Sequence, residues 1–255
     1  DIFVIDLWGV MHNGIELNEK AVEAVDQLIK NSKKIVFLSN APRPSAKVID
    51  FLLKMKMDKQ YLSNVVTSGE AAMSAINKNK FGKTFFHIGP PRDFDLFKDL
   101  KKNKKESIEI SDYILCTGLF DDYNEDLKYY KNLFEENLQK KMICTNPDLI
   151  VDRGNNRELC AGSVAMIYEK MGGEVVYFGK PYPEVYSQSI DNRNRKTLAI
   201  GDNLNTDIKG ANLLNYDSLL ISNGVHKNEI IDKGIEKTSK QYEAIVNYMQ
   251  SDLKW

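Results

Sequence analysis

The residues of this sequence that could do chemistry stand directly after short apolar segments. They are a carboxylate, a hydroxyl with its neighbouring amide, a lysine, and two further carboxylates: Asp6, Ser39, Asn40, Lys180, Asp202 and Asp207. Oxygen atoms of carboxylates are the ligands that Mg²⁺ prefers, and such a cation binds phosphoryl oxygens in turn. A separate carboxylate could attack phosphorus while lysine, hydroxyl and backbone N–H groups neutralise the phosphoryl oxygens. These residue types together predict phosphate-ester chemistry on a divalent cation.

Taken one at a time, these residues have ordinary structural explanations. Asp6 and Asp202 could form turns at strand ends, Ser39 could cap a helix, and Lys180 could lie in a surface turn. The functional interpretation is favoured because such residues stand at the ends of four apolar segments, in the correct order along the same chain.

The elements that must position these residues alternate along the chain. Four segments have the length and β-branched content of buried parallel strands: residues 2–7, 34–39, 196–200 and 217–222. Between them, Asn18 and Ser45 are expected to cap amphipathic helices, and residues 242–249 suggest a last helix. Alternating strands and helices predict an α/β fold with a doubly wound parallel sheet, which binds ligands at the carboxyl ends of its strands.

A second α/β unit is expected inside the first. Its strand candidates are residues 84–88, 113–116, 141–145 and 174–178. We therefore predict a core domain of residues 1–80 plus 178–255 and an inserted smaller domain of residues 81–177. The lysine-rich segment 101–106 and the polar segment 153–161 are expected to be solvated loops.

Composition narrows the range of partners. Lys and Arg number 35 against 36 Asp and Glu, so the formal net charge of -1 predicts no nucleic-acid partner. No apolar run approaches the roughly 20 residues that span a bilayer. Three cysteines without a C-x-x-C pair fit a reducing compartment, and we expect a cytoplasmic protein with a small-molecule partner. The sequence begins inside an apolar run, so the alternative of a further segment before residue 1 stays open.

With these motifs, the sequence resembles the haloacid dehalogenase superfamily, and specifically class IIA, in which a cap domain is inserted between the second and third motifs. The resemblance covers essentially the whole chain. The four catalytic motifs correspond to Asp6-Leu7-Trp8-Gly9-Val10, Leu38-Ser39-Asn40, Gly179-Lys180-Pro181-Tyr182-Pro183 and the segment from Gly201-Asp202 to Asp207. The signals of the class IIA cap correspond to Cys144-Thr145-Asn146-Pro147-Asp148 and Gly162-Ser163.

The resemblance implies a Mg²⁺-dependent phosphoric monoester hydrolase of the p-nitrophenylphosphatase and sugar phosphatase type. Asp6 would form an aspartyl-phosphate while its other oxygen binds Mg²⁺. Asp202 and the backbone carbonyl of Trp8 would complete the protein ligands, and Asp207 would lie in the outer shell of the metal. The substrate would be a small phosphorylated metabolite that the cap selects, and the cap would offer surface for a homodimer.

The remaining motif residues are implied to hold the phosphoryl group. Ser39 and Asn40 would bind it, together with the loop around Trp8, and Lys180 would stabilise both the nucleophile and the transferred phosphate. A dehalogenase is disfavoured, because that chemistry needs no metal and would leave Asp202 idle.

Trp8 departs from the family pattern. The family's second motif-I aspartate protonates the leaving oxygen and later deprotonates the attacking water, which an indole cannot do at neutral pH. Such acid–base help is worth roughly 10²–10⁴ in rate, or about 3 to 5 kcal/mol of barrier.

Three hypotheses follow from Trp8. In the first, another group supplies the proton, with His12, Glu70 and Asp121 as candidates. In the second, the enzyme acts only on acidic leaving groups or transfers the phosphoryl group to an acceptor other than water. In the third, the chain binds a phosphorylated metabolite without turnover.

Overall fold

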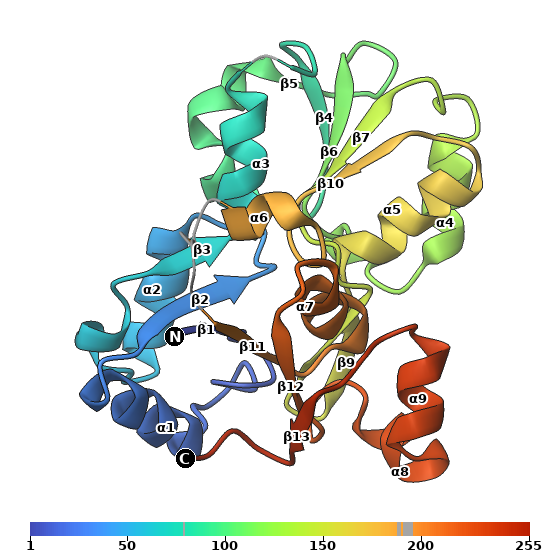
Figure 1. The fold of residues 1–255 in the computed structure, drawn as a ribbon. Coiled ribbons are helices and arrows are strands. Elements are labelled where there is room, and N and C mark those ends of the chain that lie inside the picture. The colour runs from blue at the N-terminus through green and yellow to red at the C-terminus, as the bar shows by residue number, and fades with distance from the viewer. Residues whose placement is uncertain (79, 188–189, 191–195) are drawn as a thin grey trace.

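The computed structural model describes residues 1–78, 80–187, 190 and 196–255, which form two α/β units (Figure 1). The larger unit contains a six-stranded sheet with the strand order β13-β12-β11-β1-β2-β3, in which every pair is parallel. The strands of this core sheet are β1 (Ile2–Ile5), β2 (Lys34–Ser39), β3 (Val65–Thr67), β11 (Thr197–Gly201), β12 (Asp217–Ile221) and β13 (Tyr248–Gln250). The predicted doubly wound α/β fold is confirmed.

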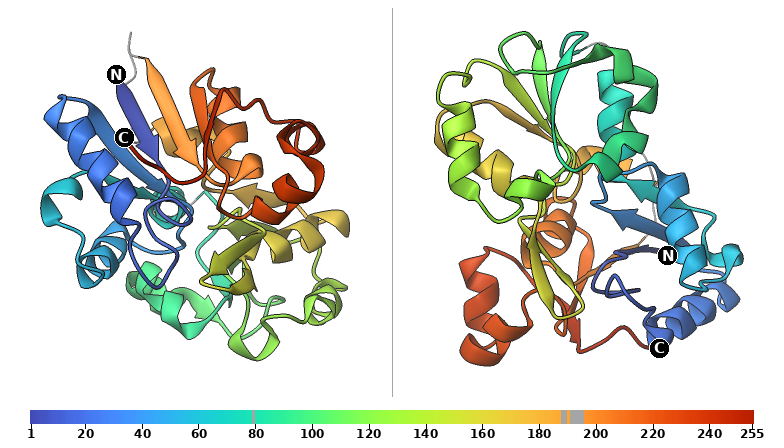
Figure 2. Two further views of the ribbon diagram at one scale, coloured as in Figure 1. Left: turned by 90° about the horizontal axis from the view of Figure 1, so that it is seen from below. Right: turned by 180° about the vertical axis from the view of Figure 1, so that it is seen from behind.

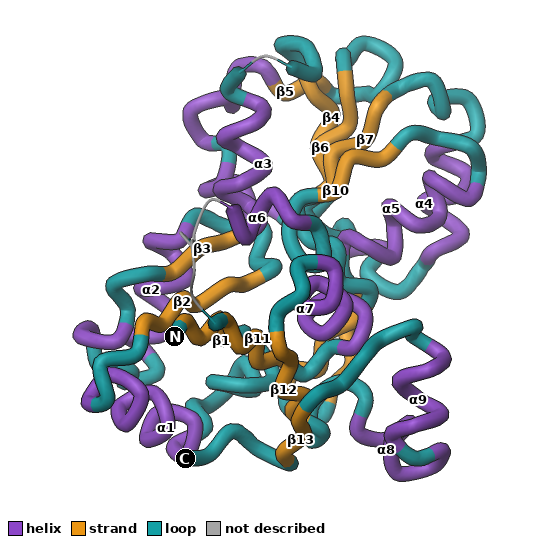
Figure 3. Tube along the Cα trace, viewed as in Figure 1, coloured by secondary structure: helices purple, strands orange, loops and turns teal. Residues whose placement is uncertain are grey.

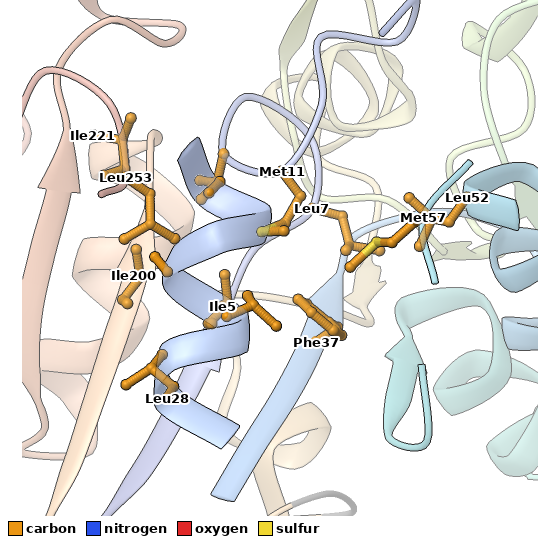
Figure 4. Close-up of a cluster of buried hydrophobic side chains, with 14 of the residues drawn as sticks. Ile5, Leu7, Met11, Leu28, Phe37, Leu52, Met57, Ile200, Ile221 and Leu253 are labelled. Atoms are coloured by element: carbon orange, nitrogen blue, oxygen red, sulfur yellow. The ribbon is translucent and has the colours of Figure 1, made fainter. Parts of the chain in front are cut away.

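Helices cover both faces of the core sheet, which explains why its strands are short and apolar throughout. On one face, α1 (Glu19–Lys30) and α2 (Ser45–Lys54) pack against the sheet, and Figure 4 shows Leu28 of α1 beside Ile5 and Phe37. On the other face lie α3 (Ser68–Ile76), α6 (Pro183–Ser187) and α7 (Lys209–Leu213). The helices α8 (Lys227–Lys233) and α9 (Ile235–Gln241) follow β12.

The smaller unit is built on a five-stranded parallel sheet with the order β10-β7-β6-β4-β5. Its strands are β4 (Phe85–Ile88), β5 (Lys104–Lys105), β6 (Tyr113–Cys116), β7 (Lys141–Cys144) and β10 (Val175–Tyr177). Two helices, α4 (Leu127–Phe134) and α5 (Ala161–Lys170), bury Tyr130 and Tyr168 on one face of this cap sheet. The short helices are η1 (Lys59–Tyr61), η2 (Pro91–Leu96), η3 (Lys98–Asn103), η4 (Asp121–Tyr123) and the π-helical η5 (Leu204–Ile208).

Helix α3 connects the two units. Ala71 packs with the core sheet, whereas Ala72 and Ile76 pack with the second face of the cap sheet. Because α3 shares its side chains between both units, the predicted division at residues 81 and 177 stays a prediction.

A separate β-hairpin reaches from the cap to the core. It consists of β8 (Ile150–Arg153) and β9 (Asn156–Leu159), which pair antiparallel with each other. In the right-hand view of Figure 2, the hairpin extends from the cap sheet down beside the core. The prediction of a solvated loop over residues 153–161 was therefore wrong.

Three further local predictions differ from the structure. Ser45 is the first residue of α2 rather than its cap, and its hydroxyl donates to Glu70. The expected helix over residues 242–249 is replaced by β13, which pairs with β12 at the edge of the sheet (Figure 3). Residues 101–106 are not a plain loop, because they contain the end of η3 and the edge strand β5.

Other local predictions are confirmed. The side chain of Asn18 accepts a hydrogen bond from the backbone N–H of Ala21 and caps α1. All three cysteines are buried with free thiols.

No helix in the described part of the chain combines the length and the hydropathy that a membrane crossing requires.

Candidate active site

The structure brings the sequence-predicted residues together at the carboxyl ends of the core strands. Asp6 follows β1, Ser39 ends β2, and Asp202 follows β11. All of them are buried, as are the remaining predicted side chains Asn40, Lys180 and Asp207. The α/β topology thus places at one edge groups that lie up to about 200 residues apart in the sequence.

Three carboxylates and one ammonium group form the centre of this edge. Asp6, Asp202 and Asp207 each offer an oxygen, and these oxygens lie within 4.8 Å of one another. Lys180 Nζ donates to Asp6 Oδ1 at 2.5 Å and to Asp207 Oδ1 at 2.7 Å. One buried cation faces three buried carboxylates, so the cluster carries excess negative charge, which is costly away from water unless a further cation or protons neutralise it.

The electrostatics of the cluster follow from this imbalance. Burial raises the pKa of Asp6 to about 7; Lys180 lowers it, but not enough to offset burial and Asp207. Burial, with the charges of Asp6 and Asp207, raises the pKa of Asp202 well above its usual range. Burial lowers the pKa of Lys180, but the neighbouring carboxylates outweigh it, so the pKa of Lys180 lies above its ordinary value.

Close packing leaves little room around the carboxylates. A Cβ atom on Gly9 would lie 2.1 Å from Asp202 Oδ2, so only glycine fits after Trp8. The backbone N–H of Val225 donates to the same oxygen at 2.9 Å. These contacts fix the Asp202 carboxylate from two sides.

Asn40 joins three segments of the site. Its Oδ1 accepts from the backbone N–H of Lys180 at 2.7 Å, and its Nδ2 donates to the Lys180 carbonyl and to Asp148 Oδ1, both at 3.1 Å. Ser39 lies beside it at the wall of the cavity, where its hydroxyl accepts from the backbone N–H of Ala41. Asn40 therefore holds the loop of Lys180, the end of β2 and the cap in one arrangement.

Asp148 is a residue of the site that sequence reasoning placed only in a cap motif. It borders the same cavity as Asp6. Burial raises its pKa to about 6, Lys180 lowers it, and Asp207 raises it further. The sequence signal was the Thr-Asn-Pro-Asp motif, but nothing in the sequence indicates that this carboxylate meets the catalytic edge of the other unit.

The side chain of Trp8 contacts the cap hairpin. Its indole Nε1–H donates to the carbonyl of Asp152 at 2.7 Å, and the Arg153 guanidinium lies 4.8 Å from the ring centroid. The indole N–H is thus already bound by the protein. Metal ligation by the Trp8 carbonyl stays a prediction.

The three candidates for a replacement acid differ in position. His12 is buried between the rings of Trp8 and Phe51, and its Nδ1 accepts from the backbone N–H of Gly14 at 3.0 Å. Burial, with Arg153, lowers the pKa of His12 to about 4, so it is neutral at pH 7. Glu70 lines a different, smaller hollow, where Ser45 donates to it. Asp121 borders the main cavity but pairs with Arg92 at 2.8 Å.

A cavity of about 1320 Å³ opens above the carboxylates. The core edge, the cap and the hairpin all contribute to its wall. Two arginines at the wall already have carboxylate partners, since Arg92 pairs with Asp121 and Arg43 pairs with Asp93 at 3.4 Å. The cavity exceeds the roughly 300–1,000 Å³ of a usual small-molecule site.

Comparison with known proteins identifies the family of this chain. A sequence model of haloacid dehalogenase-like hydrolases matches residues 3–102, and a second HAD-hydrolase-like model matches residues 177–249. The crystal structure of a haloacid dehalogenase-like hydrolase from Brucella suis 1330 has 31% sequence identity and a TM-score of 0.81, covering 89% of this chain and 86% of that chain. The chain belongs to the haloacid dehalogenase family.

Two other proteins are similar to this chain. The acid sugar phosphatase of Staphylococcus epidermidis is 24% identical over 234 residues, which is 90% of this chain and 89% of that protein. A glycerol phosphate phosphatase of Mycobacterium tuberculosis, whose structure is a complex with magnesium, shares the fold with a TM-score of 0.65 and 24% identity, covering 88% of this chain and 69% of that one. The expected enzyme class, a phosphoric monoester hydrolase of haloacid dehalogenase type, agrees with these relatives.

Proposed function

We propose that this chain hydrolyses phosphate monoesters of small metabolites in a Mg²⁺-dependent reaction that phosphorylates Asp6. One observation supports this above all others: oxygens of Asp6, Asp202 and Asp207 lie within 4.8 Å of one another, with Lys180 as their ammonium partner. Such a set fits a phosphoryl group and a divalent cation together, because each neutralises part of the charge of the other.

The ligand atoms suit Mg²⁺ in kind. Asp6 and Asp202 would hold the ion through carboxylate oxygens, Trp8 through its backbone carbonyl, and Asp207 would act from the outer shell. The bound ion would supply charge neutralisation for the phosphoryl oxygens. Its charge would also lower the pKa of Asp6 from about 7 and keep this carboxylate ionised as a nucleophile.

The chemical step belongs to Asp6. One of its carboxylate oxygens forms a bond to phosphorus while the bond from phosphorus to the ester oxygen breaks, and the ester oxygen leaves with the electron pair. Water then attacks the phosphorus of the aspartyl-phosphate, which returns the carboxylate of Asp6 and releases inorganic phosphate. Lys180 would neutralise the transferred group, and Ser39 would hydrogen-bond to it.

Proton transfer is the weak part of this reaction. The indole N–H of Trp8 is bound to Asp152, and His12 stays neutral with its Nδ1 accepting from the protein. Without a proton from Trp8 or His12, the leaving oxygen retains more of its negative charge, which favours acidic leaving groups such as phenolates. We expect p-nitrophenyl phosphate to react faster than an alkyl phosphate by roughly 10²–10⁴, the usual value of acid–base help.

The test is a Mg²⁺ assay with p-nitrophenyl phosphate and a sugar phosphate, combined with rapid quench and intact-mass measurement of phosphorylated Asp6. Turnover that Asp6→Asn reduces by more than about 10³, or about 4 kcal/mol of barrier, supports the proposal. A burst that stalls at the phosphorylated enzyme would instead indicate transfer to another acceptor. Neither turnover nor burst, with phosphate binding retained, would indicate a binding protein. The cytoplasmic location and the homodimer stay predictions.

A further inference from the structure

The segment that follows Asp6 meets the cap hairpin through Trp8. Besides the hydrogen bond from the indole to the Asp152 carbonyl, the ring has the Arg153 guanidinium over its face and the ring of His12 against it at 5.1 Å between centroids. Arg153 is held in turn by Glu158, at 2.9 Å, on the other strand of the hairpin. Trp8 is thus in contact with the hairpin and with its own loop at once.

Two glycines allow this contact to be close. A Cβ atom on Gly14 would lie 2.5 Å from Cζ2 of Trp8, and one on Gly154, at the tip of the hairpin, would lie 2.6 Å from Cδ1 of Ile15. The backbone N–H of Gly154 donates to the Asn13 carbonyl at 3.1 Å. Ring, hairpin tip and core loop fit together without room for additional side-chain atoms.

A second attachment lies on the opposite side of the hairpin. Arg157 donates to both carboxylate oxygens of Asp152, at 2.8 and 2.9 Å, and its Nη2 also donates to the carbonyl of Val225 at 2.9 Å. Val225 is the residue whose N–H binds Asp202. The hairpin is therefore fastened to the core loop that carries Asp6 and to the loop after β12, whose Val225 N–H binds Asp202.

We propose that Trp8 is a positioning residue, which fastens the hairpin of residues 150–159 to the core, and that this hairpin is a fixed wall of the cavity that limits the size of the ester group admitted. An aspartate at position 8 would have no N–H to donate to the Asp152 carbonyl and no ring for Arg153. Tryptophan at this position cannot transfer a proton, but its side chain attaches the cap hairpin to the core. The limit on ester size rests on the proposed function, whereas the attachment does not.

The attachment of the hairpin to the core can be measured without an assay of enzyme activity. Trypsin cleaves after Arg153 and Arg157, so the rate of cleavage reports how often the hairpin opens. Trp8→Phe keeps an aromatic ring but removes the N–H, and it should speed cleavage by about three- to tenfold, the factor of one net hydrogen bond. Trp255→Phe is the matched control, because Trp255 is 68% exposed and is the other tryptophan of the chain. Equal cleavage rates in both variants and the wild type would overturn the proposal.

A second variant covers the case in which Trp8→Phe fails to fold. Arg157→Gln leaves the loop of Asp6 intact and removes the attachment to Val225, and it should speed cleavage after Arg153 by a similar factor. Fluorescence adds a direct readout, because Trp255→Phe leaves Trp8 as the single tryptophan. In that protein, Arg157→Gln should increase quenching of Trp8 by acrylamide; unchanged quenching together with unchanged cleavage would refute the attachment.

The size limit is tested with two phosphate esters. In Mg²⁺, the ratio of kcat/KM for naphthyl phosphate to kcat/KM for p-nitrophenyl phosphate should rise by about three- to tenfold in Trp8→Phe and in Arg157→Gln, but not in Trp255→Phe. An unchanged ratio with faster cleavage would overturn the size limit and leave the attachment standing. If the wild type turns over neither ester, the proposed function fails, and the cleavage experiment still decides on the role of Trp8.

Discussion

The core and the cap both present polar residues at the carboxyl ends of parallel strands, but among the residues that the structure describes the excess of buried charge lies at the core edge. At the cap edge, His87 Nε2 and Thr117 Oγ1 lie 2.8 Å apart, and the hydroxyl of Thr145 donates to the Cys116 carbonyl. One buried carboxylate, Asp93, follows β4, and Arg43 of the core is its partner. Each of these polar groups of the cap edge therefore has a partner, which for Asp93 comes from the core.

At the core edge, the same architecture collects carboxylates. Asp6, Asp202 and Asp207 of the core, together with Asp148, which reaches this edge from the cap, surround one buried ammonium group, that of Lys180. Fold alone therefore does not mark the site, because two similar sheets differ in what their strand ends carry. Excess buried charge marks it, since such charge is stable only with a ligand or with a proton taken up.

Removing the cation that is paired with the buried carboxylates of each edge should separate the two edges most clearly. Lys180→Met leaves the carboxylate cluster without its ammonium group, so we expect loss of turnover and about 3–5 kcal/mol less free energy of unfolding. Arg43→Met should cost no more than about 2 kcal/mol, because the Arg43 side chain is 39% exposed and water can replace it. Urea unfolding at pH 7 measures both. Equal losses would contradict the distinction between the edges.

Each unit buries a neutral histidine, so this histidine should make each unit sensitive to acid. Burial, with Arg153, lowers the pKa of His12 to about 4, and burial, with Lys104, lowers the pKa of His87 to about 3. Between these values and the ordinary 6.5, the unfolded chain binds protons that the folded chain does not. The contribution of these two histidines to stability is therefore fully present above pH 6.5 and falls as pH decreases, by on the order of 3 to 5 kcal/mol for each histidine.

Urea unfolding between pH 5 and 7.5 tests this pH dependence. His12→Gln and His87→Gln should each remove part of the slope of the unfolding free energy against pH. A slope that neither variant changes would mean that other groups, such as the clustered carboxylates, control the acid response.

Much of the core edge could be predicted, because several of its residues stand at or directly after the ends of strands that are apolar throughout. Asp6 and Asp202 lie at the expected strand ends for this reason, since parallel strands bring their carboxyl ends to one edge whatever their distance in sequence. Their roles in the reaction stay predictions. The cap sheet was found on the same grounds, with β6 at residues 113–116 as predicted.

The hairpin and the direction of Trp8 could not be predicted, because both depend on contacts between distant segments. Trp8 and Asp152 lie 144 residues apart, and the strands of the hairpin are short and polar enough to be taken for a loop. The strand β13 was missed for a related reason. Tyr242, Ile245 and Tyr248 fit a helical spacing, and only pairing with β12 makes Tyr248 part of a strand.

Binding of Mg²⁺ should change the free energy of unfolding least among these experiments, but the change is the most specific to the core edge. An ion that binds only the folded chain stabilises it by RT ln(1 + [Mg²⁺]/Kd), which is about 1.4 kcal/mol at ten times Kd and should raise the unfolding midpoint by about 3–6 °C. Asp202→Asn should abolish this shift, because the cluster loses a proposed ligand. Asp93→Asn, the matched change at the cap edge, should retain it, since one carboxylate paired with an arginine offers no site for a divalent cation. If the shift persisted in Asp202→Asn and disappeared in Asp93→Asn, the ion would bind at the cap, and excess buried charge would no longer distinguish the two edges.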